Sequence, residues 1–353
     1  MKKKLLIFIV GILSLFMVVG CKKTTKTEAP IKDDGISIHT DLQEAYLKDD
    51  YDNFSKYATG VENLSTPKPV VLTFGEDVIA LSNNYTVYLS ESNTFTTYKT
   101  YESTTTSVSI YNLKIHTEYF WKVNNGSVES ATFNFTTTSK GPRNINAGEL
   151  TNVRDLGGWE IEGGYVNQGL IYRTSKFNAD ESTELLINQD GINVFVNELG
   201  VKTEIDLRKV TENGDITTSP LGNTVSYIFI PMNSSGNILT LNPDEIVQVF
   251  KVFANRDNYP ICFHCSIGTD RTGLIAFLVN ALCGVKETDL YRDYLFSNFG
   301  NIGSMRTPSA IKDYIKKINL KSGKTLQEKT FNYLIGLGLT EAELNNVINI
   351  MTK

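Results

Sequence analysis

The residues with the clearest capacity for chemistry lie at 264–273, where the sequence reads His-Cys-Ser-Ile-Gly-Thr-Asp-Arg-Thr-Gly. A free thiol has a pKa of about 8.5 and is mostly protonated at neutral pH, but converging backbone amides and a helix N-terminus favour the thiolate. We therefore predict that Cys265 is a nucleophile and that the planar guanidinium of Arg271 clamps a phosphoryl group in transfer. The predicted phosphate-binding residues are Ser266, Ile267, Gly268, Thr269, Asp270 and Arg271.

Three neighbours of the cysteine have supporting roles in this prediction. The ring nitrogens of His264 would fix the backbone of Cys265 rather than act as a base. Gly268 permits the turn and the close approach of backbone to phosphate. The hydroxyl of Thr272 can donate a hydrogen bond to the sulfur when the thiolate leaves during hydrolysis of a phosphocysteine. The alternative is a buried apolar cysteine beside a surface arginine, and it would leave the whole run of matching residue types to chance.

The flanking sequence predicts a strand before this loop and a helix after it. Residues 261–263 are suited to a short buried strand, because they form an apolar run. Most residues at 274–282 are apolar, and Gly284 stands where a helix C′ residue is expected. An earlier helix is predicted with Asn242 as its N-cap and Pro243 as its first residue. A strand, a tight loop and a helix N-terminus together form an anion-binding site.

The His-Cys-x5-Arg-Thr-Gly spacing is the signature of the protein tyrosine phosphatase superfamily. The chain from about residue 144 to 353 resembles a bacterial branch of tyrosine phosphatases, some members of which also hydrolyse phosphoinositides. The resemblance implies an α/β fold whose central, mostly parallel sheet has helices on both faces, and we expect this domain over residues 140–353. Many members of the branch carry lysine where this chain has Thr269. The shared segments are 152–158, 171–175, 204–208 and 289–295.

The leaving oxygen of a phosphomonoester needs a proton donor, and the chain has no Trp-Pro-Asp segment to supply one. The resemblance implies Asp270, which matches the loop aspartate that the bacterial branch uses. Asp206 is the second candidate, because it follows an apolar strand and should emerge at the same sheet edge. An ion pair with Arg208 or Arg154 is the interpretation of Asp206 that we favour over catalysis. The motif with Arg154 and Asp155 is expected to brace the site.

The predicted reaction uses no metal ion and no organic cofactor, since the cysteine and the loop supply the nucleophile and the stabilisation of charge. The four cysteines, at positions 21, 262, 265 and 283, lack the paired spacing of a zinc finger. Three of them lie close together, which excludes a disulfide framework across the chain but leaves a local pairing of Cys262 or Cys283 open. The net charge is −5, so nucleic acid is not an expected partner.

Residues 66–139 are rich in threonine, serine, tyrosine, valine and phenylalanine in alternating runs, which predicts a small all-β sandwich. The stretch 113–119 resembles the tyrosine corner of fibronectin type III domains, with Ile115 where that family usually has proline. Trp121 and Tyr119 are expected in the core rather than in a carbohydrate site, and the domain is expected to be a spacer or adhesion module. The predicted strands lie at 70–74, 85–89, 107–111, 119–123 and 131–135.

The N-terminus resembles the signal peptide of a bacterial lipoprotein. Lysines precede an apolar run at 5–20, and the Val-Val-Gly-Cys ending at Cys21 resembles the lipobox whose cysteine receives a diacylglyceryl group. The resemblance implies a signal peptide at 1–21, a lipid anchor on Cys21 and a body held on the outer face of a bacterial membrane. An uncleaved membrane anchor is the alternative and gives the same topology. Residues 22–65 are expected to be a polar tether with a short helical segment.

These observations predict a surface-anchored protein tyrosine phosphatase that hydrolyses phosphomonoesters through a phosphocysteine. Its expected substrates are phosphotyrosine proteins or phosphoinositides. Two alternatives stay open: a phosphoinositide or dual-specificity phosphatase, and a catalytically idle adhesin that binds phosphorylated ligands. The complete set of Cys265, Asp270 and Arg271 argues against the idle protein. The Arg-Thr-Gly ending of the loop favours a phosphatase over a rhodanese-like sulfurtransferase.

Overall fold

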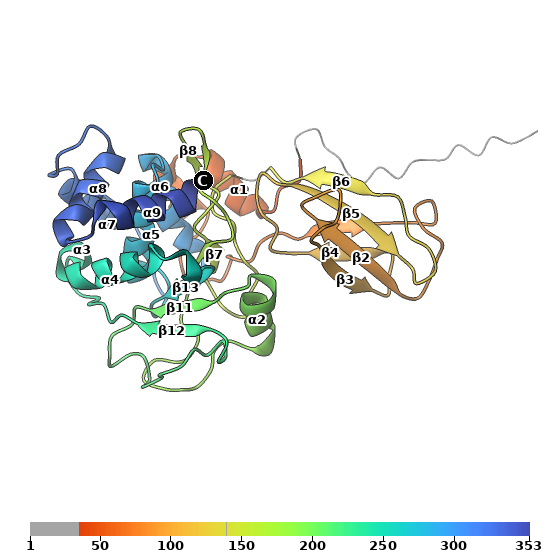
Figure 1. Ribbon diagram of the computed structural model, residues 1–353, viewed down its shortest axis with the longest axis horizontal. Helices are drawn as coiled ribbons and strands as arrows, with labels where there is room; N and C mark the ends of the chain where they lie inside the picture. The colour runs from red at the N-terminus through yellow and green to blue at the C-terminus, as the bar shows by residue number, and fades with distance from the viewer. Residues whose placement is uncertain (1–34, 139) are drawn as a thin grey trace, which may run out of the picture.

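The computed structural model describes residues 35–138 and 140–353. It places an all-β domain beside a larger α/β domain (Figure 1). The expected signal peptide at 1–21, the lipid anchor on Cys21 and the tether up to residue 34 lie outside the described residues. Within the described part of the chain, no helix combines the length and the hydropathy that crossing a bilayer would require.

The all-β domain has two antiparallel sheets that share one core. Side chains alternate between this core and the outer face, as the pleat of a strand requires: in β5, Tyr119, Trp121 and Val123 are buried and Glu118 is exposed. The Tyr119 hydroxyl accepts a hydrogen bond from the backbone N–H of Lys114 at 2.8 Å. The smaller sheet pairs β1 (Val70–Thr73) with β4 (Ser107–Ile110), and the larger has the order β3 (Lys99–Ser103), β2 (Tyr85–Ser90), β5 (Glu118–Asn124) and β6 (Phe133–Thr136).

The central sheet of the α/β domain has five strands in the order β12-β11-β13-β10-β7. The parallel strands are β12 (Ser226–Phe229), β11 (Thr203–Asp206), β13 (Ile261–His264) and β10 (Ile171–Thr174), and β7 (Arg154–Asp155) is antiparallel at one edge. The expected, mostly parallel sheet is confirmed. Because β13 is the middle strand, the loop at its carboxyl end lies at the centre of the sheet edge where ligands of α/β folds bind.

Both faces of this sheet are buried, each against its own core. Ile261 and Phe263 of β13 join a large core with α4 and α5, whereas Cys262 joins a smaller core with Phe177 and Phe195. A strand buried on both faces must be apolar throughout, which explains the run in β13. The helices are α2 (Gln189–Asn193), α3 (Ile238–Leu241), α4 (Pro243–Phe253), α5 (Asp270–Leu282), α6 (Glu287–Leu295), α7 (Ser309–Ile318), α8 (Leu326–Leu337) and α9 (Glu341–Thr352).

The helix before the loop begins where the sequence predicts, but its N-cap works differently. α4 starts at Pro243, and Asn242 makes no side-chain hydrogen bond to the helix. The Asn242 side chain instead accepts a hydrogen bond from the backbone N–H of Asn233 at 2.6 Å and donates one to the carbonyl of Ile238 at 2.7 Å. The predicted capping by Asn242 is therefore wrong, because its amide group closes the preceding loop.

Part of the segment 22–65 belongs to the folded α/β domain. α1 (Asp41–Lys48) and the 3₁₀ turn Tyr51–Lys56 pack against this domain, and they are the short helical segment that the sequence predicts. Tyr46 and Phe54 lie in the large core. Aromatic residues at these positions supply apolar surface that the sheet and its helices would otherwise leave uncovered.

Replacing Tyr46 with alanine should lower the free energy of unfolding by about 3–5 kcal/mol, because removing a fully buried aromatic side chain leaves a cavity. Tyr46→Phe is the matched control. Within the described residues the Tyr46 hydroxyl is buried without a hydrogen-bond partner, so its loss should be neutral or stabilising. Urea unfolding followed by circular dichroism measures both variants. An alanine variant as stable as the parent protein would show that this segment is peripheral to the fold.

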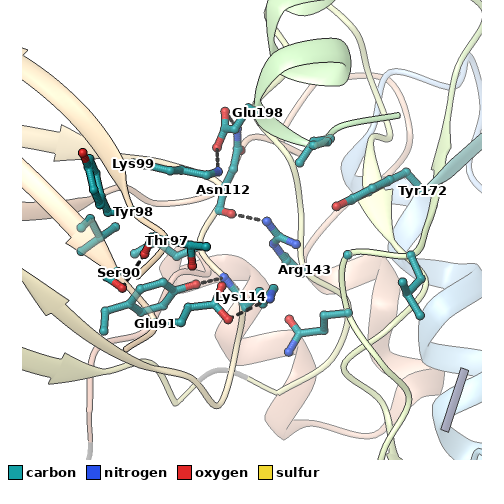
Figure 2. A pocket seen from close by; sticks show the side chains of 17 residues that line it. Ser90, Glu91, Thr97, Tyr98, Lys99, Asn112, Lys114, Arg143, Tyr172 and Glu198 are labelled. Atoms are coloured by element: carbon teal, nitrogen blue, oxygen red, sulfur yellow. Dashed lines mark hydrogen bonds and ion pairs between the residues drawn. The ribbon is translucent and has the colours of Figure 1, made fainter. Parts of the chain in front are cut away.

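A cavity of about 590 Å³ lies at the junction of the two domains (Figure 2). Lys99 of the β domain and Glu198 of the α/β domain form an ion pair of 3.2 Å beside it. Arg143 is buried in the junction, where it pairs with Asp155 at 3.1 Å and donates to the backbone carbonyl of Asn112. Asp155 therefore stabilises the junction, and its expected role as a brace beside the loop is wrong. No residue of β13 or α5 lines this cavity.

Candidate active site

The segment 264–273 folds as the predicted strand, loop and helix. β13 ends at His264 and α5 begins at Asp270, so the loop between them opens with Cys265. Cys265 is only 1% exposed and lies just before the N-terminus of α5, where the helix dipole and unpaired amides favour an anion. Gly268 has a φ of +68°, in the left-handed region that favours glycine.

The surroundings of Cys265 favour its thiolate. Burial by itself raises the pKa of the thiol, but the positive charge of Arg271 and hydrogen bonding from Thr272 outweigh burial, so the pKa lies below its ordinary value. The Thr272 hydroxyl is buried and, within the described residues, makes no hydrogen bond of ordinary geometry, so its interaction with the sulfur is a loose one. Burial instead raises the pKa of Cys283 to about 12. Cys262, Cys265 and Cys283 are all free thiols, so the local disulfide left open above is absent.

The guanidinium of Arg271 is held by three acceptors at the far end of the loop. Nη1 donates to Oε2 of Glu212 at 2.6 Å and to the carbonyl of Leu207 at 3.2 Å, and Nη2 donates to Oγ of Ser266 at 3.3 Å. Burial lowers the pKa of Arg271, but the charges of Cys265 and Glu212 raise it by more. A guanidinium has about five N–H donors, so donors remain to bind phosphoryl oxygens.

His264 supports the loop from behind. Its Nε2 lies 2.9 Å from Oε1 of Glu204, and its Nδ1 lies 3.4 Å from the carbonyl oxygen of Cys265. Burial lowers the pKa of His264, but the carboxylates of Asp206 and Glu204 raise it by more, so the net shift is upward. A protonated imidazole can donate to both neighbours. The ring thus lies against the cysteine backbone, as the sequence predicts.

The carbonyl groups of the loop are held on its outer side by two buried residues. Nδ2 of Asn152 donates to the carbonyls of Ile267 and Gly268, at 3.2 and 3.0 Å, and to the Thr269 hydroxyl at 3.1 Å. Nη2 of Arg173 donates to the carbonyl of Gly268 at 2.8 Å. Because the N–H and C=O of a trans peptide point in opposite directions, this arrangement turns the loop amides inward, toward a bound anion.

Arg154 is the structural brace that the sequence predicts. It pairs with Asp293 at 3.3 Å and donates to Oδ1 of Asn152, which orients the Asn152 amide group on the loop. Arg173 pairs with the same Asp293 carboxylate at 2.8 Å. Burial and the nearby Arg173 charge lower the pKa of Arg154 to about 9. One carboxylate thus holds two buried arginines, and both of them position the loop.

The two candidate proton donors have different surroundings. The Asp270 side chain is 38% exposed in the first turn of α5, and its carboxylate pairs with Arg306 at 2.9 Å. Asp206 is fully buried, pairs with Arg208 at 2.7 Å and accepts a hydrogen bond from the Tyr227 hydroxyl at 2.9 Å. Asp206 therefore has the ion-pair role that we favour for it. Asp270 is the one of the two that a substrate can reach.

The comparison with known proteins agrees with this geometry. The family model described as the tyrosine phosphatase family matches residues 145–347, which is more than half of the chain. The chain belongs to the tyrosine phosphatase family.

Two curated proteins are similar to this tyrosine phosphatase family member. It is 26% identical to a candidate tyrosine-protein phosphatase of Cupriavidus necator over an alignment of 178 residues, and the match covers 43% of this chain and 62% of that protein. It is 28% identical to a tyrosine-protein phosphatase of Nostoc commune over an alignment of 121 residues, and the match covers 28% of this chain and 41% of that protein. The chain thus spans less than two thirds of the length of either relative.

Two solved structures are similar to part of the chain. TpbA of P. aeruginosa in complex with phosphotyrosine is 22% identical, with a TM-score of 0.29, over 40% of this chain and 77% of that chain. The core catalytic domain of the PP-IP phosphatase Siw14 of S. cerevisiae is 20% identical, with a TM-score of 0.28, over 42% of this chain and 88% of that chain.

Several residues that hold the site of this family member were not predicted as site residues, among them Glu212, Arg306 and Asn152. Glu212 lies in the loop that follows β11, so its place at the carboxyl edge of the sheet is a usable signal. Arg306 comes from the irregular segment before α7, and a local sequence pattern gives no signal for it. Asn152 has a φ of +62°, which asparagine adopts more readily than most residues.

Replacing Gly268 with alanine should disrupt the loop. An added Cβ would lie 2.3 Å from the carbonyl oxygen of Thr174, at a φ of +68°. Gly200→Ala is the matched control, because the φ there is +67° but a Cβ would meet nothing within 4 Å. The control should lose about 1–2 kcal/mol of stability from backbone strain alone. It should bind tungstate, a phosphate mimic, as the parent protein does.

The Gly268→Ala protein should bind tungstate at least about tenfold more weakly, because displaced loop amides lose hydrogen bonds to a charged ligand. Isothermal titration calorimetry measures this affinity, and circular dichroism establishes that both variants are folded. Equal affinities for Gly268→Ala and Gly200→Ala would show that the close approach to Thr174 is irrelevant to the anion site.

Proposed function

We propose that this protein is a protein tyrosine phosphatase that hydrolyses phosphomonoesters through a phosphocysteine intermediate. The observation that carries the proposal is a buried thiol, Cys265, that shares a loop with the buried cation of Arg271, and the carbonyls of this loop are held outward. Membership of the tyrosine phosphatase family supports the same activity. The residues present supply the nucleophile, the charge stabilisation and a proton donor, so the proposed reaction needs no cofactor.

In the proposed first step, the Cys265 thiolate attacks phosphorus. The S–P bond forms as the P–O bond to the leaving group breaks, and the leaving oxygen takes a proton from Asp270. Arg271 and the loop amides stabilise the negative charge on the three equatorial oxygens. In the second step, water attacks phosphorus, gives a proton to the Asp270 carboxylate and displaces the thiolate, to which the Thr272 hydroxyl can donate. The protonation state of the enzyme is then restored.

Two exposed apolar side chains support an aryl phosphate, such as phosphotyrosine, as the substrate. Val210 is 64% exposed and lies in the same loop as Glu212, which contacts Arg271. Met305 is 43% exposed and directly precedes Arg306. Each of these segments also supplies a contact to the site, from Glu212 to Arg271 and from Arg306 to Asp270. The phenyl ring of phosphotyrosine gains from burying apolar surface there, whereas a hydroxyl-rich inositol ring gains less.

A substrate panel tests the proposed activity. The purified protein without residues 1–21 is assayed, with a metal chelator present, on a phosphotyrosine peptide, the matching phosphoserine peptide and a phosphoinositide. We expect the phosphotyrosine peptide to be hydrolysed fastest and the chelator to have no effect. Faster hydrolysis of the phosphoinositide would replace phosphotyrosine with the alternative substrate class. Failure to hydrolyse any of the three would contradict the proposed function.

The proposal extends to the surface anchor and the β domain. A lipid on Cys21 would hold the protein on the outer face of a bacterial membrane, with phosphotyrosine proteins as partners there. The bond between the Tyr119 hydroxyl and the Lys114 N–H supports a fibronectin type III-like domain that acts as a spacer. Metabolic labelling with an alkyne fatty acid should label the parent protein but not Cys21→Ala. A labelled Cys21→Ala protein would contradict the anchor.

A further inference from the structure

Arg306 holds the carboxylate of Asp270. Its Nε and Nη2 lie 2.9 and 3.0 Å from the two carboxylate oxygens, and the Tyr294 hydroxyl donates to Oδ1 at 3.1 Å. A bidentate guanidinium and the N-terminus of a helix both stabilise a carboxylate in its charged form. A proton donor must be neutral. The ion pair between Arg306 and Asp270 must therefore break before Asp270 can donate a proton.

Arg306 is also close to the place that a phosphoryl group would occupy. The hydrogen bond with Asp270 is the main cause that raises the pKa of Arg306, and the nearby Cys265 thiolate raises it further. The Arg306 side chain is 21% exposed, so a ligand can reach the guanidinium. The charge of Arg271 is matched by Glu212 and that of Arg306 by Asp270. A phosphate dianion adds negative charge that competes with Asp270 for Arg306.

The backbone around Arg306 is fixed, so the side chain can change partners without movement of the segment. The backbone N–H of Arg306 donates to Oδ1 of Asn298 at 2.7 Å, and Nδ2 of Asn298 donates back to the Arg306 carbonyl at 2.9 Å. The N–H of Ile302 donates to the carbonyl of Gly60 at 2.9 Å. The movement required is thus a rotation of one side chain, on a scale that rotamer changes cover.

The other titratable groups around Asp270 come from three elements. Cys265 lies in the loop itself, Tyr294 in α6 and Tyr314 in α7. Burial raises the pKa of both tyrosines, so they stay neutral in the working range of a phosphatase. The positive charge in contact with the Asp270 carboxylate, within the described residues, is that of Arg306.

We propose that Arg306 is a positioning residue that holds the Asp270 carboxylate in a bidentate ion pair and transfers its guanidinium to a phosphoryl oxygen when the substrate enters. Asp270, released from the ion pair, then takes a proton from solvent, gives it to the leaving oxygen and regains one from the attacking water. It returns this proton to solvent when the phosphate leaves and Arg306 pairs with it again. The inference rests on the proposed phosphatase function and deepens it. Its consequence is that the proton donor becomes available only when a phosphoryl group is bound.

The pH profile of kcat/KM tests the first half of this inference, because its basic limb reports the proton donor of the free enzyme. With a phosphotyrosine peptide, Arg306→Gln should move this limb to higher pH. It should also raise KM at least about tenfold, since a charge-assisted hydrogen bond to the phosphoryl group is lost. Lys312→Gln removes one exposed charge from α7 and is the matched control, which should change neither quantity. An unchanged limb or an unchanged KM in Arg306→Gln would overturn the inference.

Arg306→Lys keeps the experiment usable if the glutamine variant does not fold. Lysine retains the charge but cannot form the bidentate pair. The basic limb should then move in the same direction by a smaller amount. If the basic limb of the kcat/KM profile were identical in Arg306→Lys and in the parent protein, the inference would again be overturned.

Tungstate binding to the Cys265→Ser protein tests the second half without turnover. Adding Arg306→Gln to this protein should weaken the affinity at least about tenfold in calorimetry. Equal affinity with and without Arg306 would overturn the transfer of the guanidinium to the anion. If the parent protein hydrolyses no phosphomonoester but Arg306 still strengthens tungstate binding, the proposed function fails while the anion contact stands.

Discussion

Replacing Cys265 with serine should lower kcat by about 10⁴-fold or more, since a hydroxyl with no base to activate it is a far weaker nucleophile than a thiolate. The loop amides and Arg271 remain, so tungstate should still bind. Initial rates with a phosphotyrosine peptide and calorimetry with tungstate measure the two properties separately. We expect a protein that binds the phosphate mimic and does not turn over.

Cys283→Ala is the matched control for this variant. Cys283 is also a buried free thiol, but it lies at the C-terminal end of α5, and burial raises its pKa to about 12. Its replacement should leave kcat per folded molecule unchanged. Undiminished hydrolysis by the Cys265→Ser protein would refute the role of Cys265 as nucleophile.

Replacing Arg271 with lysine should reduce kcat/KM by about 10³-fold, the scale on which removal of an arginine or an oxyanion donor from a phosphoryl-transfer or acyl-transfer site acts. A lysine ammonium cannot hold Glu212 and two phosphoryl oxygens in one plane. It also places its charge differently relative to Cys265. We therefore expect the optimum of the pH profile to change as well as the rate, and initial rates across pH measure both.

Arg256→Lys is the control for a general effect of this substitution. Arg256 is exposed, and its guanidinium lies 5.7 Å from the centre of the Tyr259 ring. This variant should keep the parental kcat/KM. If Arg271→Lys also kept it, the bidentate clamp would play no part in the rate.

The loop itself could be predicted from the sequence because its chemistry is contiguous. The nucleophile, the guanidinium and the amides between them lie within 264–273, and β13 and α5 are short-range consequences of the apolar runs on either side. The role of His264 could also be predicted, because it directly precedes Cys265 and its ring lies against the Cys265 carbonyl. Such features depend on spacing along the chain, which a sequence displays directly.

The support of the loop could not be predicted, because it is assembled from distant parts of the chain. Asn152 and Arg173 hold the loop carbonyls, and Asp293 joins Arg173 to Arg154 across more than a hundred positions. Only the general role of Arg154 followed from its motif. The ion pair between Asp270 and Arg306 could not be predicted for the same reason. Arg306 is distant in the sequence, and the segment before α7 has no pattern that points to the loop.

The errors in the predicted fold have identifiable physical causes. β3 (Lys99–Ser103) was not predicted, because it is the edge strand of its sheet and its side chains are largely exposed, so no apolar alternation marks it. The Asn242 side chain forms a loop rather than a cap because Asn233 and Ile238 offer it partners that the local sequence does not reveal.

Trapping the reaction intermediate tests the central claim most directly. The protein is mixed with excess phosphotyrosine peptide, quenched in acid within milliseconds and digested, and the site of added phosphate is located by mass spectrometry. The account predicts phosphate on the sulfur of Cys265 during turnover and none in the Cys265→Ser protein. Turnover without phosphate on Cys265, or with phosphate on another residue, would contradict it.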